Sequence, residues 1–578
     1  MSRLPKIMLG VVALALILAL VASACTSNPT ATPAPTATSA PTATRPAATA
    51  VPTPTIAGPS ATATATPVPA TPTPAPPTAV PKPTGTFTLA LNTLLAQTFD
   101  PRLAASTDPQ TNLGPVMDYL VGVDNDGKLA PGLSTSWAIA PDGLSWTFKL
   151  RQGVKFHNGD EFTADDVKFT LDSFMGPDSK SSFAASFRAG IAGVEVVDKY
   201  TVKVNTKGAW GVFPYAVSPL EGVEGMMLPK NYIDKVGWKD FAKKPVGTGP
   251  WKLVSYEVGV SNIYEANEGY WGQVPRFKTL KMFQIPEEST RIAMLKKGEA
   301  DAIDISISSK KQVADAGFKV KTISDAWNHS IVLYGSALPA AGPTYKKEVR
   351  QALSLAVNRD EVAKFIYDGD AVPGAQQTLT PVTLGFDPNL KPDPYDVNKA
   401  KQLLKDAGYE NGFSINLYTF PQAGNPELGR LAEVVAGYWD KIGVKATIIP
   451  IDLAGMRAMY NAKPQPDKLV GQASTFALIQ RGSSINQMRL LYHSQDVFRI
   501  DQNPEVDKLL DDSLKEPDAK KVDENIRKAA RIEFDDARGF SVVRPNMLLG
   551  LGKNVGDIQV IKGLPNWTKM MASATPAK

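Results

Sequence analysis

The side chains best suited to chemistry are scarce in this chain and stand far apart. Its 578 residues include three histidines, His157, His329 and His493, and a single cysteine. No HExxH motif and no Cys/His cluster occurs, and such spacings are what a protein-built transition-metal site requires. The sequence therefore predicts neither a metal site nor a cofactor.

Other signatures of catalysis are missing or incomplete. Gly247-Thr248-Gly249 lacks the lysine and further glycines of a phosphate loop and is typical of a tight turn; no GxSxG motif occurs. The pairs Asp165-Asp166 and Asp511-Asp512 are neighbours on expected helices, so their carboxylates point to different faces and suit a paired acid and base poorly. The patterns predict that the chain is not an enzyme, with a secreted hydrolase as the alternative.

The single cysteine, Cys25, follows the pattern of an export signal. A positively charged start leads into the apolar residues 7–21, and Ala22-Ser23-Ala24 precede the cysteine. The segment resembles a bacterial lipoprotein lipobox, with Ala22 where leucine is commonest. The resemblance implies a signal peptide over 1–24 and a lipid on Cys25. The alternative is a single-pass anchor, for which the apolar run is shorter than the ~20 residues that span a bilayer.

Residues 25–84 have the composition of a disordered tether. They are mostly Thr, Ala, Pro and Ser, they contain no aromatic residue, and 16 of the 47 prolines lie within 26–83. Dense proline removes backbone donors and favours extended chain, so no packed core is expected here. At ~3 Å per residue such a tether would reach on the order of 100 Å.

Residues 85–578 are long enough for more than one domain. The formal charge of the whole chain is only +5 and no long basic run occurs, which predicts no nucleic-acid partner. No stretch beyond residue 21 is apolar enough to cross a membrane. The sequence thus predicts a globular head without a spanning segment of its own.

Local patterns predict the elements of this head. Apolar residues that alternate with polar or small ones predict a strand over 87–91. Residues 137–150 are predicted to hold two strands around a Pro-Asp-Gly turn. Thr163 and Asp166 form a capping box that starts a helix. Strands and helices then alternate, which indicates a mixed α/β class with more than one sheet. The expected elements are strands at 279–285 and 302–307, helices at 289–297, 349–357, 358–366 and 396–407, and a strand–helix–strand unit with parallel strands over 413–420, 431–442 and 444–451.

Several long stretches resemble one family together. The chain is similar to the family 5 solute-binding proteins of peptide/nickel-type ABC transporters over essentially the whole head, and the resemblance rests on blocks that occur in the family's order and spacing. These blocks are LAPGLSTSWAIAPDGLSWTFKLRQGVKFHNGDEFTADDVKF, VGTGPWKLVSYEVG with NEGYWG, EVRQALSLAVNRDEV, and DPYDVNKAKQLLKDAGYENGF.

The resemblance implies a periplasmic-binding-protein-like clamshell of two lobes with an inserted subdomain (class II, cluster C type). The hinge would be two chain crossings near Val320 and Val543, and solute contacts from both lobes would favour the closed state. The implied parts are lobe I at 85–125, 246–321 and 544–578, the subdomain at 126–245, and lobe II at 322–543.

The resemblance also implies where a solute is held. Peptide-binding members place an aspartate and a tryptophan on a lobe II strand, but the matching stretch 467–485 has neither beyond Asp467. Its polar candidates are Gln472, Ser474 and Arg481. A buried ammonium would lack its charge partner, which argues against ordinary peptides, whereas a carboxylate or phosphate could pair with Arg481. The alternative for Arg481 is a solvated loop residue.

Further ligand-binding candidates follow from their positions. Gln97 and Thr98 match the first lobe I loop that reaches the ligand in the family, and Phe183 matches an aromatic residue beside the cleft, with a core position as its alternative. Trp327 and His329 follow the first hinge crossing and alternate along a strand, so both face one side. A structural role is the alternative for His329.

These features predict an extracytoplasmic, lipid-anchored monomer that hands a small solute to an ABC permease. The alternative within binding proteins is a receptor that signals solute to a membrane sensor without uptake. A modified peptide, a sugar, an opine-like anion and a chelated metal all stay open as the solute.

Overall fold

The computed structural model describes residues 81–94, 97–104, 110–422, 424–463, 465–479, 482–496, 498, 500–564 and 567–577. Residues Thr78–Lys578 form one compact unit. The predicted signal peptide, the lipidation site Cys25, nearly all of the tether and the candidate Arg481 lie outside the described residues. No helix among the described residues combines the length and apolarity that a bilayer crossing needs.

The first large sheet has seven strands and is built from three separate parts of the chain. Its central strand β1 (Thr86–Leu91) pairs in parallel with β10 and β11, and the other pairs are antiparallel. The strands predicted at 87–91, 279–285 and 302–307 are confirmed. The order is β12-β19-β11-β1-β10-β9-β8, with β8 (Trp251–Glu257), β9 (Ser261–Ala266), β10 (Thr279–Gln284), β11 (Ala302–Ile305), β12 (Lys319–Ile323) and β19 (Met547–Leu551).

The second large sheet has six strands and contains the predicted strand–helix–strand unit. β15 (Phe413–Thr419) and β16 (Val444–Pro450) pair in parallel along their whole length, and α12 (Leu428–Asp440) connects them. The order is β14-β18-β13-β17-β15-β16, with β13 (Trp327–Leu333), β14 (Ala371–Pro373), β17 (Ala473–Ile479) and β18 (Gly539–Pro545).

A four-stranded antiparallel sheet and a short hairpin lie within residues 121–206. The Pro-Asp-Gly turn joins β4 (Ser134–Ile139) to β5 (Ser145–Leu150), as predicted. The Thr163 capping box is confirmed, because the Thr163 N–H donates to Asp166 at 2.9 Å and starts α2 (Ala164–Met175). The sheet order is β4-β5-β7-β6, with β6 (Ile191–Asp198) and β7 (Thr201–Thr206); the hairpin is β2 (Val121–Val123) and β3 (Leu129–Pro131).

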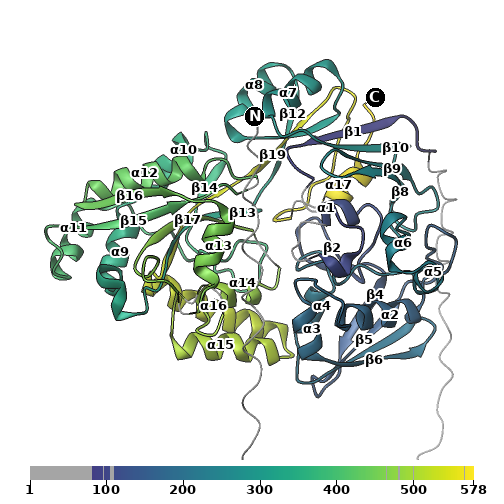
Figure 1. The fold of residues 1–578 in the computed structure, drawn as a ribbon, viewed down its shortest axis with the longest axis horizontal. Coiled ribbons are helices and arrows are strands. Elements are labelled where there is room, and N and C mark those ends of the chain that lie inside the picture. Colours follow the sequence, from purple (N-terminus) through teal and green to yellow (C-terminus); the bar gives the residue numbers. More distant parts are fainter. Residues whose placement is uncertain are drawn as a thin grey trace, which may run out of the picture. The chain divides into compact units, whose positions relative to one another are not determined.

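Helices cover these sheets (Figure 1). Those not yet named are α1 (Gln110–Leu113), α3 (Ala184–Gly190), α4 (Phe213–Ala216), α5 (Lys230–Val236), α6 (Trp238–Lys243), α7 (Glu288–Lys297), α8 (Lys310–Asp315), α9 (Lys347–Leu355), α10 (Arg359–Phe365), α11 (Val397–Asp406), α13 (Leu453–Asn461), α14 (Ile485–Tyr492), α15 (Pro504–Lys515), α16 (Ala519–Asp536) and α17 (Trp567–Ser573).

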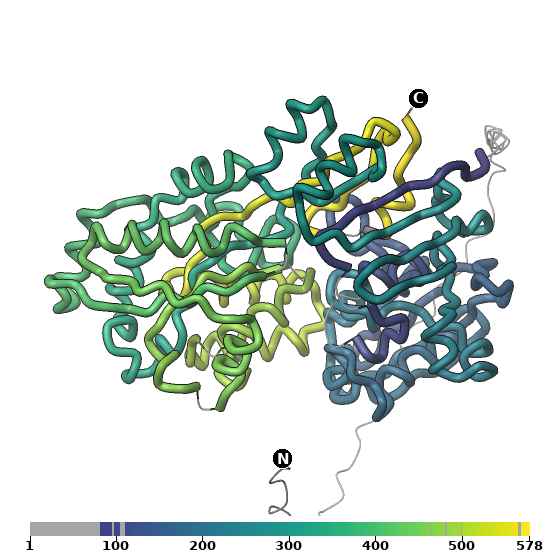
Figure 2. Tube along the Cα trace, turned by 45° about the horizontal axis from the view of Figure 1, so that its top comes forward, coloured from purple at the N-terminus to yellow at the C-terminus, as the bar shows by residue number. Residues whose placement is uncertain are grey.

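The chain passes between the two large sheets twice. It leaves the seven-stranded sheet after β12 and enters the six-stranded sheet at β13, and it returns at Asn546, the one residue between β18 and β19. Figure 2 shows this second passage as the yellow segment that runs from one sheet into the other. Both passages lie three or more residues beyond the predicted crossings near Val320 and Val543.

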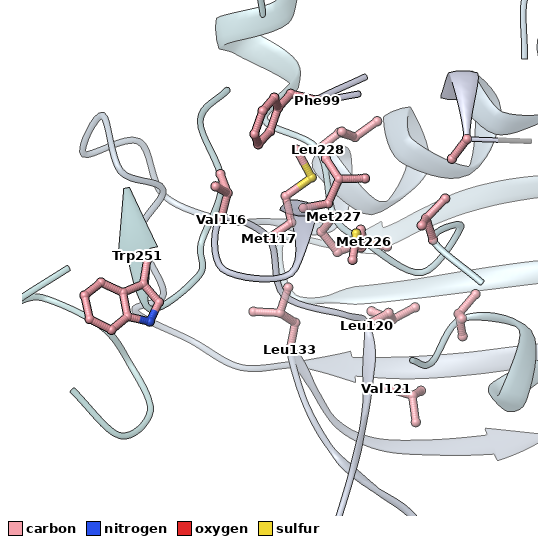
Figure 3. Packing of buried hydrophobic residues seen from close by; sticks show 14 of the residues in the cluster. Phe99, Val116, Met117, Leu120, Val121, Leu133, Met226, Met227, Leu228 and Trp251 are labelled. Atoms are coloured by element: carbon pink, nitrogen blue, oxygen red, sulfur yellow. The ribbon is translucent and has the colours of Figure 1, made fainter. Parts of the chain in front are cut away.

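One apolar core joins segments that the sequence assigns to lobe I and to the inserted subdomain. Val116 and Met117 pack in one cluster with Leu133 and Met227, all of them almost fully buried (Figure 3). The Gly247-Thr248-Gly249 run lies against this cluster: a Cβ on Gly247 would come within 2.0 Å of the Val116 carbonyl oxygen. Glycine at these positions therefore allows two backbone segments to approach closely, where a side chain would clash.

Candidate functional site

A cavity of about 780 Å³ lies where strands of both large sheets end. From the seven-stranded sheet, its lining includes the carboxyl ends of β1 and β11 and the segment after β10. From the six-stranded sheet it includes the ends of β15, β16 and β17 and the start of β13. Ligands of open α/β sheets bind outside the carboxyl ends of parallel strands. The topology thus accounts for the position of the cavity.

Trp327 and His329 both line this cavity from β13, as the predicted alternation requires. The His329 ring is fully buried and lies 2.6 Å from the Tyr367 hydroxyl through Nδ1 and 2.6 Å from Asn425 Oδ1 through Nε2. Burial lowers its pKa to about 4, against the opposing effect of the Asn425 hydrogen bond. The ring is therefore neutral near pH 7; because Oδ1 of Asn425 can only accept, Nε2 carries the proton.

The loop between β15 and α12 forms much of the wall on the six-stranded side. The Gln422 side chain accepts from the Ala477 N–H at 2.8 Å and donates to the Ala477 carbonyl at 3.0 Å, which fastens the loop to β17. The bond from His329 to Asn425 fastens the same loop to β13. Glu427, which precedes the first residue of α12, also lines the cavity.

Three charged side chains enter from the seven-stranded side. Arg291 pairs with Asp304 at 3.0 Å and donates to the backbone carbonyls of Ile285 and Pro286, both at 2.8 Å. Burial raises the pKa of Asp304 to about 6, against the opposing charge of Arg291. Glu288 accepts from the Ser306 N–H at 2.6 Å and from the Ser306 hydroxyl at 2.9 Å.

Glu427 brings a further carboxylate to the same space from the other sheet. Burial is the main cause that raises its pKa, and the negative charge of Glu288 raises it further. Backbone N–H groups, including that of Ile307, bind the carboxylate and oppose this rise.

The other described candidates lie outside the lining of this cavity. Gln97 donates to Asn262 at 2.8 Å, and the Thr98 hydroxyl contacts the backbone of Asp100 at 3.3 Å. The Phe183 N–H donates to Glu224 at 2.8 Å, and its ring packs on the apolar core. Gln472 accepts from the Asn416 N–H at 2.7 Å, and Ser474 contacts the Tyr334 hydroxyl at 3.0 Å.

Gln472 and Ser474 lie at the start of β17, whereas Ile479 at its end reaches the cavity. The structure thus brings Trp327 and His329 to the cavity together with Glu288, Asn425 and Glu427, which sequence reasoning missed. The sequence held a signal common to Glu288, Asn425 and Glu427, because each of them follows the carboxyl end of a predicted strand.

A separate contact joins the segment after α4 to the segment after β17. It lies away from the two passages between the large sheets. Glu221, in the segment after α4, accepts from the Ser483 N–H at 3.1 Å and from Asn486 Nδ2 at 3.2 Å. The Ser483 hydroxyl donates to the same carboxylate. Glu221 is only 2% exposed, so these bonds are shielded from water.

Comparison with known proteins identifies the family of this chain. The family model described as "Bacterial extracellular solute-binding proteins, family 5 Middle" matches residues 128–483. The chain is 32% identical over 364 residues to the glutathione-binding protein GsiB of Salmonella typhimurium, covering 62% of this chain and 68% of that protein. It is 32% identical over 346 residues to the dipeptide-binding protein of Escherichia coli, covering 56% and 63%.

The fold is shared with solved structures. The ABC transporter substrate-binding protein CtaP from Listeria monocytogenes superimposes with a TM-score of 0.74 at 24% identity, covering 84% of this chain and 99% of that one. This likeness confirms the predicted α/β fold of the periplasmic-binding-protein type. Together with the family match over more than half of its length, it leads to one conclusion: the chain belongs to the bacterial extracellular solute-binding proteins of family 5.

Proposed function

We propose that the head captures a small, peptide-like solute in the 780 Å³ cavity and delivers it to the permease of an ABC importer. The observation that carries the proposal is the position of the cavity, which is lined by strand ends of both large sheets. The family binds solutes and is not a family of enzymes, so the alternative of a secreted hydrolase is excluded.

The capture step is a closure of two lobes around the solute. We infer a division into lobe I, subdomain and lobe II, with the passages after β12 and at Asn546 as the hinge; both passages lie slightly beyond the predicted crossings. Solute that touches both sheets favours the closed state by its differential affinity for the two states. Trp327 contributes an apolar face to this contact, and His329 holds the Asn425 loop in place.

Solute binding is expected to raise the thermal stability of the full-length protein. A solute at roughly 100 times its Kd adds about 2.7 kcal/mol to the free energy of unfolding by mass action. Native mass spectrometry of freshly purified protein would identify a retained solute, and a thermal shift with that compound would check the effect. A protein that retains no solute and gives no shift with a broad panel of peptides, sugars and amines contradicts the proposal.

Lipid on Cys25 is proposed to hold the protein at the outer face of the cell membrane. The variant Cys25→Ala cannot accept the lipid, so nearly all of the protein is expected to leave the membrane fraction. Fractionation of cells that produce either form, read by immunoblot, checks this. Ser27→Ala serves as the control, and a variant that stays in the membrane contradicts lipid anchoring.

A further inference from the structure

We propose that the loop of residues 561–564 couples the solute in the cavity to the closure of the two lobes. In this loop Leu564 contacts the solute, and Gly563 forms, together with Gly127, a seat for Val382 of the predicted lobe II. The inference rests on the proposed function, because it concerns how the same cavity drives closure. It assigns a positioning role to a segment that belongs to neither of the large sheets.

Val382 packs against two glycines that belong to other parts of the chain. Gly127 lies in the turn between β2 and β3 at φ +78°, and Gly563 has φ +71°. A Cβ on Gly563 would lie 2.2 Å from Val382 Cγ2, and a Cβ on Gly127 would lie 3.4 Å from Val382 Cβ. Carbon atoms pack best about 3.5–4.0 Å apart, so a side chain at position 563 would displace Val382. The valine therefore rests on bare backbone.

The segment that carries Val382 is a tight turn with buried ends. The Thr380 N–H donates to the Thr383 hydroxyl at 3.0 Å, and the Thr383 N–H donates to the Thr380 carbonyl at 2.9 Å. Both threonines are buried, so water does not compete for these bonds. The turn holds Val382 at its tip. Val382 can thus reach the two glycines only when lobe II lies against the subdomain and the loop.

The loop connects this seat directly to the cavity. Leu564 lines the cavity and packs with Ile561 in a small apolar cluster. An isolated antiparallel bridge pairs these two residues, so Lys562 and Gly563 form the tight turn between them. Gly563 is therefore the direct neighbour of a residue that faces the solute. A solute that packs on Leu564 holds the turn in the position that receives Val382.

The same loop is bound to the first passage and to the hairpin of β2 and β3. The Gly563 N–H donates to the carbonyl of Ser324, in the passage after β12, at 2.8 Å. The Lys562 side chain pairs with Asp126 at 2.8 Å, and its N–H donates to the Asn125 carbonyl at 3.2 Å. The cavity, the hinge and the seat thus meet in one loop. A solute that favours the seated arrangement shifts the population toward the closed state.

The test replaces Gly563 by alanine in the full-length protein. The added methyl group takes the space of Val382 Cγ2, so the lobes should fail to close and the Kd should rise about tenfold or more, in proportion to the lost closed population. Calorimetry measures the Kd and small-angle X-ray scattering measures closure, with trialanine, maltose, putrescine and any copurified solute as probes. Gly153→Ala is the matched control, because Gly153 also has a positive φ, +75°, and its added Cβ would have nothing within 4 Å.

The double variant Gly563→Ala/Val382→Ala separates the seat from strain in the turn. Val382→Ala leaves only the Cβ, 3.2 Å from the new methyl group, which a small shift accommodates. The double variant should therefore close, with a Kd within about twofold of Val382→Ala alone. A Gly563→Ala protein that closes and binds like the native one overturns the inference, as does a loss that the double variant does not recover; both leave the proposed function standing. Failure of the native protein to bind every probe, with no copurified solute, overturns both.

Discussion

Replacement of Glu221 by alanine is expected to weaken solute binding about tenfold or more and to favour the open form of the protein. The Glu221 carboxylate accepts from two groups of Ser483 and from Asn486, and it is buried where they meet. A hydrogen bond to a charged group contributes about 1.5–3 kcal/mol. These bonds join the predicted subdomain to the predicted lobe II, so they exist only when the two sides are together. Their loss lowers the population of the binding-competent state.

The measurement combines calorimetry with small-angle X-ray scattering. The variant should show a larger radius of gyration without solute and a higher Kd, and saturating solute should restore the compact form. Glu195→Ala, an exposed glutamate of β6, is the control. Ser483→Ala and the double variant complete a cycle in which the two losses should not add, because both residues act through one contact. An unchanged Kd and radius in Glu221→Ala would show that this contact does not take part in closure.

Local elements of this protein follow from short stretches of sequence. The capping box of Thr163 with Asp166, the Pro-Asp-Gly hairpin and the β15–α12–β16 unit depend on residues close together in the chain, and all three are confirmed. The fold class follows from the same patterns, because alternating strands and helices leave few ways to cover a sheet on both faces.

The site could be predicted only in part, because it depends on contacts between distant segments. Alternation places Trp327 and His329 on one face of β13, yet the partners of His329 lie 38 and 96 residues away, at Tyr367 and Asn425. The matching stretch 467–485 predicts polar contacts near Gln472, but only the tertiary arrangement decides which end of β17 reaches the cavity. Glu288 and Glu427 line the cavity from different sheets, and no local pattern in the sequence brings them together.

A buried acid away from the cavity is expected to set how stability changes with pH. Glu533, on α16, is 3% exposed and lies against Asp501, which is 1% exposed. Burial, and then the charge of Asp501, hold the pKa of Glu533 well above its ordinary value, against the attraction of Arg538. The folded state therefore keeps this proton after the unfolded state has released it near pH ~4.3.

The direction of the effect follows from this difference in proton binding. Between the unfolded and the folded pKa the native state binds more protons, so the free energy of unfolding falls as pH rises through that window. Glu533→Gln mimics the protonated form and cannot ionise. The variant should match the native protein near pH 4. At pH 8 it should be more stable by ~2 kcal/mol, because only the native protein loses stability once its unfolded state has released the proton.

Melting curves of both proteins between pH 4 and pH 9, by calorimetry in solute-free buffer, check this prediction. Glu524→Gln, on the exposed face of the same helix, should follow the native curve throughout. Arg538→Lys adds a second control, because a weaker attraction to the acid pair should steepen the loss of stability with rising pH. If Glu533→Gln loses stability with pH as steeply as the native protein, another group carries the dependence and Glu533 is ionised in the folded state.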